Sequence, residues 1–294
     1  GNNDGGDGGD GGDGKATVGT IAPLKLHLLP IHASITAAAL SVYVTSFQTP
    51  QTAFLINCTS LCYVAGYSFL KLTGLLQPRI GTLRMIDRAE WRCRLLSNIN
   101  AAALTGGAVL CFMEWPYDPP QEGWISAGIS SWPVTFASLL AGYLQWDLCW
   151  MLWHANHTFD AAAVVHHILF IAISHYVLYG WYFKVPFAWL SAAELSTLPL
   201  NARWFLAVAN KKASRAYLAA SAAFAAFFIL TRVIGYGLGI AHLWANHALW
   251  REAEYGLYFV VGGVHAGFAL NLMWAKKVVA NVAKAIGGGK SHAD

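Results

Sequence analysis

Long apolar stretches separated by short polar loops are the feature that most constrains this chain. Each stretch approaches the roughly 20 residues that a helix needs to cross the hydrocarbon core of a membrane. The eight stretches are residues 27–47, 52–70, 95–113, 133–153, 161–180, 186–208, 216–240 and 255–275. The 294 residues are 56% hydrophobic and only 12% charged, whereas soluble domains carry about 25% charged residues. We therefore expect an all-α, polytopic transmembrane helix bundle with about eight spans.

The charged loops between the stretches indicate how the helices are oriented. The segments 71–94, 209–215 and 276–290 are basic, whereas the proline-rich loop at 114–122 is acidic. With eight spans the basic segments share one side with both termini, and the positive-inside rule makes that side cytosolic. The stretch at 27–47 is the weakest, and a seven-span chain would place the N-terminus on the opposite side. This distribution of a net charge of +4 indicates membrane topology and argues against a nucleic-acid partner.

The two ends of the chain differ in composition from its middle. The first residues, GNNDGGDGGDGGDGK, cannot bury a core and are expected to be disordered. The absence of an initiator methionine leaves two origins open: a processed N-terminus after removal of a targeting peptide, or an artificial leader. We expect a tail and linker at 1–26, two transmembrane helices and a basic loop at 27–83, a main transmembrane domain at 84–279 and a basic tail at 280–294. The five cysteines lie mostly in apolar stretches and are interpreted as packing residues.

Residues 142–203 combine apolar helices with an unusual number of ionisable side chains. Such groups are costly in hydrocarbon and usually face a cavity, a partner or a pathway. Helical spacing places Glu194 and Asn201 on one face of their helix, and Arg232 on the next helix is a counter-charge for Asp147 or Glu194. We therefore predict one polar pocket inside the bundle. Its candidate residues are Asp147, His166, His167, Glu194, Asn201, Arg203 and Arg232.

The histidines allow two interpretations as ligands, and both are weak. The sequence HANH followed by VVHH superficially resembles the histidine boxes of membrane di-iron enzymes, but the spacing does not match. Axial ligation of haem by His32, His175 or His265 is compatible with facing helices, yet nothing else favours it. We predict no metal site and no bound cofactor. His154 and His157 are expected to lie in a turn at the membrane surface.

Two further interpretations of the pocket remain open. In the first, the His166–His167 pair performs general base catalysis in acyl transfer, with Glu194 or Asp147 orienting an imidazole. In the second, the polar residues are structural, and an ion pair between Arg232 and one of the two acids shapes a cavity for lipid. The residues alone do not choose between them.

Several motifs in this order resemble those of the TLC-domain family, which includes translocon-associated, longevity-assurance (ceramide synthase) and neuronal lipofuscinosis proteins. The resemblance covers about residues 84–277. Its motifs are EWRCRLLS at 90–97, GYLQWD ending at Asp147, the pair His166–His167, AELSTLPLNARW at 193–204, and Arg232 on the following helix. The chain looks closer to the small TLC-domain-containing proteins than to ceramide synthases proper.

The resemblance implies a six-helix TLC-type bundle around a cavity for a lipid chain, here preceded by two extra helices. It also implies a protein that binds or handles membrane lipid and influences membrane lipid composition. In ceramide synthases, which transfer an acyl group from acyl-CoA to a sphingoid base, the His-His pair is essential; the matching residues here are His166 and His167. The resemblance places the chain in the endoplasmic reticulum or another endomembrane, with a plastid or mitochondrial membrane as an alternative.

Two alternatives to lipid handling follow. One is an acyl-CoA-dependent N-acyltransferase, in which His166 and His167 act as base and orienter. Asp147 and Glu194 would then support the histidines, and Arg203 or basic loop residues would meet the phosphates of acyl-CoA as co-substrate. The other is a non-catalytic subunit of a larger membrane complex, whose partners would be other membrane proteins.

Overall fold

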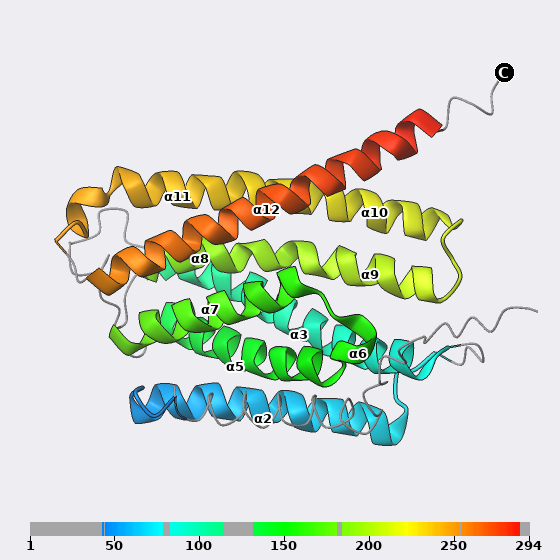
Figure 1. Cartoon of the computed structure of the whole chain (residues 1–294), viewed down its shortest axis with the longest axis horizontal. Coiled ribbons are helices and arrows are strands. Elements are labelled where there is room, and N and C mark those ends of the chain that lie inside the picture. Colours follow the sequence, from blue (N-terminus) through cyan, green and yellow to red (C-terminus); the bar gives the residue numbers. More distant parts are fainter. Residues whose placement is uncertain are drawn as a thin grey trace, which may run out of the picture.

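Long helices that run side by side form most of the described structure (Figure 1). This computed structural model describes residues 43, 45–78, 83–114, 132–180, 184–252 and 255–288. The main elements are α2 (Pro50–Thr73), α3 (Met85–Glu114), α5 (Trp132–Trp153), α6 (Ala155–Thr158), α7 (Ala161–Gly180), α8 (Lys184–Ala192), η1 (Ala193–Ser196), α9 (Thr197–Val208), α10 (Arg215–Phe227), η2 (Phe228–Gly235), α11 (Tyr236–Ala245), η3 (His247–Leu249) and α12 (Tyr255–Gly288). No β-strand occurs in these ranges, and the predicted all-α fold is confirmed.

Helices occupy seven of the eight stretches that were predicted to span a membrane. Within the described part of the chain, five helical segments are long and apolar enough to do so: Pro50–Thr73, Met85–Met113, Ala161–Gly180, Arg215–Ala245 and Tyr255–Ala283. The predicted spans at 133–153 and 186–208 coincide with α5 and with the continuous run from α8 through η1 to α9, which fall short of the same criterion. The predicted span at 27–47 lies almost entirely outside the described residues.

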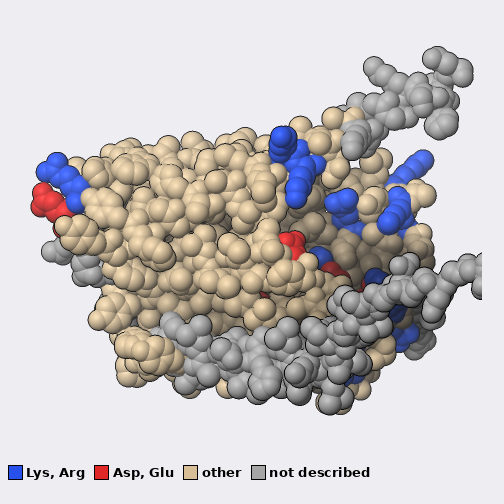
Figure 2. All heavy atoms as spheres, viewed as in Figure 1, with Lys and Arg blue, Asp and Glu red and all other residues tan. Residues whose placement is uncertain are grey.

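Basic side chains gather at one end of the bundle (Figure 2). Lys71 lies in the last turn of α2, and Arg84 directly precedes α3. Lys211 and Lys212 lie in the turn between α9 and α10, which Figure 1 shows at the same end. The predicted orientation of the helices in the membrane depends on this concentration of basic residues at one end. The predicted acidic loop, apart from Glu114, lies outside the described residues.

Helix α2 packs closely on α5 because Gly142 has no side chain. A Cβ atom at Gly142 would lie 2.5 Å from the carbonyl oxygen of Ile56 and 2.7 Å from Cβ of Thr59. At the same crossing, Ser60 Oγ donates a hydrogen bond to the carbonyl oxygen of Gly142 at 2.7 Å. Small residues and interhelical hydrogen bonds of this kind hold helices together in membranes. Helix α2 is therefore an integral part of the bundle.

Substitution Gly142→Ala is expected to push α2 away from α5, because the contacting oxygen of Ile56 belongs to a helix backbone and cannot rotate aside. We expect a loss of about 1–3 kcal/mol in the free energy of unfolding, as for other overpacked helix contacts. Thermal unfolding of the purified protein in detergent measures it. Gly106→Ala is the matched control, since among the described residues no atom outside its own stretch of helix lies within 4 Å of a Cβ there. Equal melting temperatures for the two variants would contradict this account of the packing.

Two long helical runs depart from α geometry at facing positions. The run from α8 to α9 tightens into a 3₁₀ turn at η1, and the run from α10 to α11 widens into a π-helix at η2. The two irregular segments pack against each other. Interruptions of this kind inside long helices often mark functional positions. The ionisable residues Glu194 and Arg232 lie on them, one on each.

Candidate functional site

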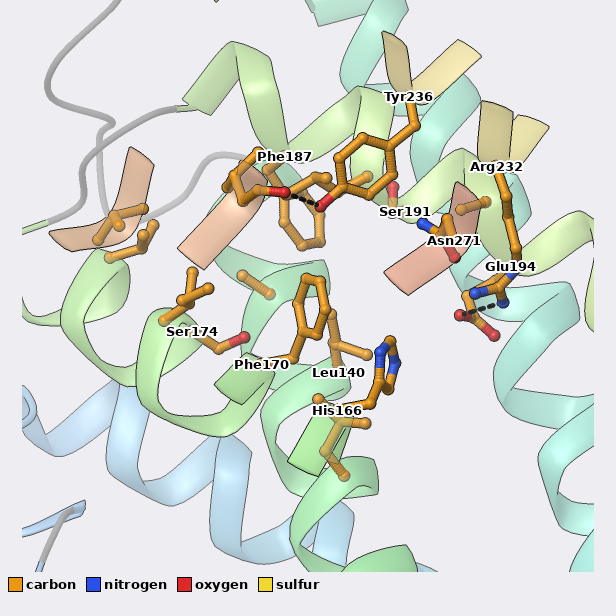
Figure 3. A pocket seen from close by; sticks show the side chains of 18 of the residues that line it. Leu140, His166, Phe170, Ser174, Phe187, Ser191, Glu194, Arg232, Tyr236 and Asn271 are labelled. Atoms are coloured by element: carbon orange, nitrogen blue, oxygen red, sulfur yellow. Dashed lines mark hydrogen bonds and ion pairs between the residues drawn. The ribbon is translucent and has the colours of Figure 1, made fainter. Parts of the chain in front are cut away.

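A small apolar cavity of about 80 Å³ lies inside the bundle between α5, α7, α8, α11 and α12. We call it the inner cavity. Most of its lining is aliphatic or aromatic, including Leu140, Phe170 and Val261. Tyr236 also lines it, but its hydroxyl group donates a hydrogen bond to the carbonyl oxygen of Val264 at 2.8 Å. The main body of this cavity is therefore suited to an apolar group (Figure 3).

A larger and more open pocket of about 440 Å³ adjoins the inner cavity toward the basic end of the bundle. We call it the outer pocket. Six of the seven predicted site residues line it: Asp147, His166, His167, Glu194, Arg203 and Arg232. His166, Glu194 and Arg232 line both spaces, and Figure 3 shows them at one end of the inner cavity. The polar groups therefore form the boundary between an apolar chamber and an accessible polar one.

Asn201, the seventh predicted residue, is not part of the lining of either space. It is 2% exposed and faces α3. Its side-chain oxygen accepts a hydrogen bond from Arg94 at 2.8 Å, and its Nδ2 donates to Asn98 at 2.8 Å. Arg94 in turn forms an ion pair with Glu90 at 2.7 Å. In this structure Asn201 holds α9 against α3.

His167 and Asp147 form a partly buried pair that fixes the orientation of the imidazole. His167 Nε2 lies 2.9 Å from Asp147 Oδ2, and His167 Nδ1 lies 2.8 Å from the carbonyl oxygen of Ala163. The carbonyl can only accept, so Nδ1 carries a proton. Asp147 also accepts hydrogen bonds from Cys93 and Tyr143, each at 3.3 Å. Because both of its nitrogens are engaged, His167 is suited to positioning and charge balance.

His166 has a different environment from its neighbour. Its ring packs against Phe170, with centroids 4.6 Å apart, and against Trp274 and His167, with centroids 5.7 Å apart. Its Nδ1 atom is buried and has no hydrogen-bond partner among the described residues. Figure 3 shows the imidazole at the boundary of the inner cavity. Of the two adjacent histidines, His166 is therefore the one with a nitrogen available to a ligand.

Glu194 is the acid that pairs with Arg232, so the structure selects one of the two predicted counter-charges. Arg232 donates to Glu194 Oε1 at 3.2 Å and to Ser196 Oγ at 2.8 Å. Thr197 donates to Glu194 Oε2 at 3.0 Å. The side chains of Arg232 and Glu194 are only 12% and 23% exposed. Charge pairs shielded from water interact strongly, and each side chain here has further hydrogen bonds.

Several lining residues of the outer pocket were not among the predicted site residues. Tyr143 lies one helical turn before Asp147, a spacing that could have revealed it. Lys277 was counted only as part of the basic segment 276–290, but it lines the pocket, as does Trp274. His154 and His157, expected at the surface, are absent from both linings.

In the described part of the chain, no group of three or more His, Cys, Asp or Glu residues could hold a metal ion.

A comparison with known protein families identifies the family of this chain. A family model described as the TLC domain matches residues 90–280. The chain belongs to the TLC-domain family. The match contains every residue that lines the outer pocket, whereas α2 precedes it. No curated protein and no solved structure matches the chain. This TLC-domain protein is thus an integral, multi-pass membrane protein of a family concerned with lipid handling.

Proposed function

We propose that this TLC-domain protein binds a lipid, holds part of its acyl chain in the inner cavity and thereby influences membrane lipid composition. The observation that carries the proposal is the junction of the two spaces at His166, Glu194 and Arg232. An apolar chamber that ends at a few convergent polar groups is the usual form of a small-molecule site. The polar end of the lipid would meet these groups.

The polar end of the ligand supplies most of the selectivity under this proposal. The chain of a membrane lipid is already out of water, so its transfer into the inner cavity yields little hydrophobic free energy. A hydrogen bond to His166 Nδ1, or to the Glu194–Arg232 pair, is by contrast available only to a lipid with a suitable head group. A polar group of the protein that is shielded from water loses its hydrogen bond when the ligand lacks a matching donor or acceptor. Such a site therefore discriminates strongly against that ligand.

Filling the inner cavity tests this proposal. Val264 lines the cavity and is 6% exposed, so Val264→Phe is expected to reduce the amount of co-purified lipid several-fold. Native mass spectrometry of the protein, followed by extraction and identification of the lipid, measures it. Val279→Phe is the matched control, because Val279 is 55% exposed on the same helix and lines neither space. Equal lipid content in wild type and both variants would contradict binding in the inner cavity.

A second candidate function, N-acyl transfer from acyl-CoA, is favoured by the unpartnered nitrogen of His166 beside a fixed His167–Asp147 pair. In this reaction the nitrogen of an amine substrate attacks the thioester carbonyl, and His166 removes a proton from that amine. The new C–N bond forms, the C–S bond breaks, and the CoA thiolate takes up the proton. A neutral imidazole is the side chain best suited to such proton transfer near pH 7. His167 and Asp147 would position His166 and balance its transient charge.

A further inference from the structure

A third cavity, of about 740 Å³, lies between α10 and α12 near the turn that joins α9 to α10. We call it the side cavity. Its lining includes three cationic side chains, which we call the basic rim: Arg203, Lys212 and Arg215. Leu218 and Val282 are among the apolar residues that line the remainder. The side cavity therefore combines a basic rim with an apolar wall.

The positive charge of this cavity is not neutralised within the described residues. None of the described residues that line it is acidic. Arg203 has a neutral partner, Tyr217: Nε donates to the phenol oxygen at 3.3 Å, and the guanidinium lies 5.7 Å from the ring centroid. Lys212 and Arg215 form no ion pair within the described ranges. Uncompensated cations around one cavity favour an anionic ligand.

Ser221 adds a neutral polar group to the same lining. Its Oγ atom is buried and has no hydrogen-bond partner within the described part of the chain. Other helical hydroxyls in this bundle, such as those of Thr231 and Ser138, donate to the carbonyl oxygen four residues earlier at 2.8 Å. The hydroxyl of Ser221 does not, although this bond is the usual solution for a buried Ser in a membrane helix. It is therefore available to a ligand.

The side cavity adjoins the outer pocket, because some side chains line both spaces. Arg203, Phe224 and Val278 line both of them. An elongated ligand can therefore contact the basic rim with one end and reach the His166–His167 region with the other. A ligand that fits this path carries an anionic group on an apolar or extended body.

We propose that the side cavity binds a phosphate group carried by an amphiphile whose remaining part extends into the outer pocket. The inference deepens the proposed function, on which it rests for the position of the apolar part. Phosphate fits because two guanidinium groups and an ammonium group together offer more donors than one carboxylate can use, and guanidinium binds phosphate oxygens in pairs. The phosphate belongs either to a lipid head group or to a water-soluble carrier such as coenzyme A.

A matched pair of probes isolates the contribution of the phosphate. 1-Oleoyl-lysophosphatidic acid and 1-oleoylglycerol share chain and glycerol, and they differ in the phosphate. We expect the full-length protein in detergent to bind the first at least about ten-fold more tightly than the second, and raised salt to reduce the difference. Lys212→Gln/Arg215→Gln is expected to weaken binding of the phosphate probe by about ten-fold or more and to leave binding of 1-oleoylglycerol unchanged.

Lys71→Gln/Lys276→Gln is the control, because it removes the same charge from exposed residues at the basic end that do not line the side cavity. The proposal is overturned if this control loses as much affinity as the cavity variant, or if neither variant loses any. If free coenzyme A displaces bound lysophosphatidic acid, the phosphate belongs to a soluble carrier. If coenzyme A does not displace it, the phosphate belongs to a lipid head group. Binding of coenzyme A without binding of either oleoyl probe would support the phosphate site and contradict the lipid-binding function.

Discussion

Replacement of Arg232 by methionine is expected to lower the free energy of unfolding by about 1–3 kcal/mol, because it leaves a partly buried charged group without its hydrogen-bonded partner. The substitution leaves the carboxylate of Glu194, only 23% exposed, without its cation. It also removes the donor to Ser196. Thermal unfolding in detergent, combined with a urea or dodecyl sulfate titration, measures the change.

Two further variants show whether the loss of stability comes from breaking the Glu194–Arg232 pair. Glu194→Gln/Arg232→Met removes both charges and is expected to recover much of the lost stability, since a neutral pair no longer leaves a buried charge. Arg251→Met breaks an exposed pair, in which Arg251 and Glu252 are 58% and 87% exposed, and is expected to cost under about 1 kcal/mol. If the Arg232 and Arg251 variants lose equal stability, the Glu194–Arg232 pair stabilises the bundle no more than an exposed pair does, which contradicts this prediction.

His166→Ala is expected to reduce acyl transfer by about 10²- to 10⁴-fold, the range by which a positioned base accelerates a reaction. The expectation follows from the proposal that His166 accepts the proton of the attacking amine, for which its unpartnered nitrogen is available. The measurement is the rate of N-acyl product formation from acyl-CoA and a sphingoid base. Lipid content is measured in parallel, because a variant that still binds lipid has kept the cavity.

The outcomes separate catalysis from lipid binding. His157→Ala is the control, since His157 is exposed and lines none of the three spaces. A wild-type protein that contains bound lipid but forms no N-acyl product would exclude acyl transfer with these substrates and leave the lipid-binding proposal standing. Loss of lipid in the His166 variant would instead assign His166 to ligand binding. Stoichiometric co-purification with another membrane protein would favour a role as a subunit of a complex.

The pairing of residues at the site shows where local periodicity succeeds and where it fails. Spacing places Glu194 and Asn201 on one helical face, but Glu194 lines the cavities and Asn201 contacts α3. Glu194 lies within the 3₁₀ turn at Ala193–Ser196, whereas Asn201 lies in the α-helix that follows it. Because 3₁₀ geometry has 3.0 rather than 3.6 residues per turn, it rotates the residues that follow to another face. The sequence contains no clear signal for this turn.

Arg232 shows the same limit of prediction from sequence, because its partner depends on how the helices pack. The sequence identifies it as a buried cation in need of an acid, and both Asp147 and Glu194 were candidates. The structure pairs Arg232 with Glu194 because η1 and η2 pack against each other, while Asp147 on α5 faces His167 on α7. A rotation of one helix by one residue, roughly 100°, would change these partners.

The sequence by itself determined that this protein is an all-α membrane bundle, where most of its helices lie and which polar residues are candidates for an internal pocket. Hydropathy and the cost of burying charge are properties of each segment, so they can be read without knowing the neighbours. Only the tertiary structure decided that six of the seven candidates line one pocket, that Asn201 does not, and that an apolar cavity meets this pocket at His166, Glu194 and Arg232. Cavities exist between helices, and their lining depends on helix rotation, crossing and local irregularity, which no single segment specifies.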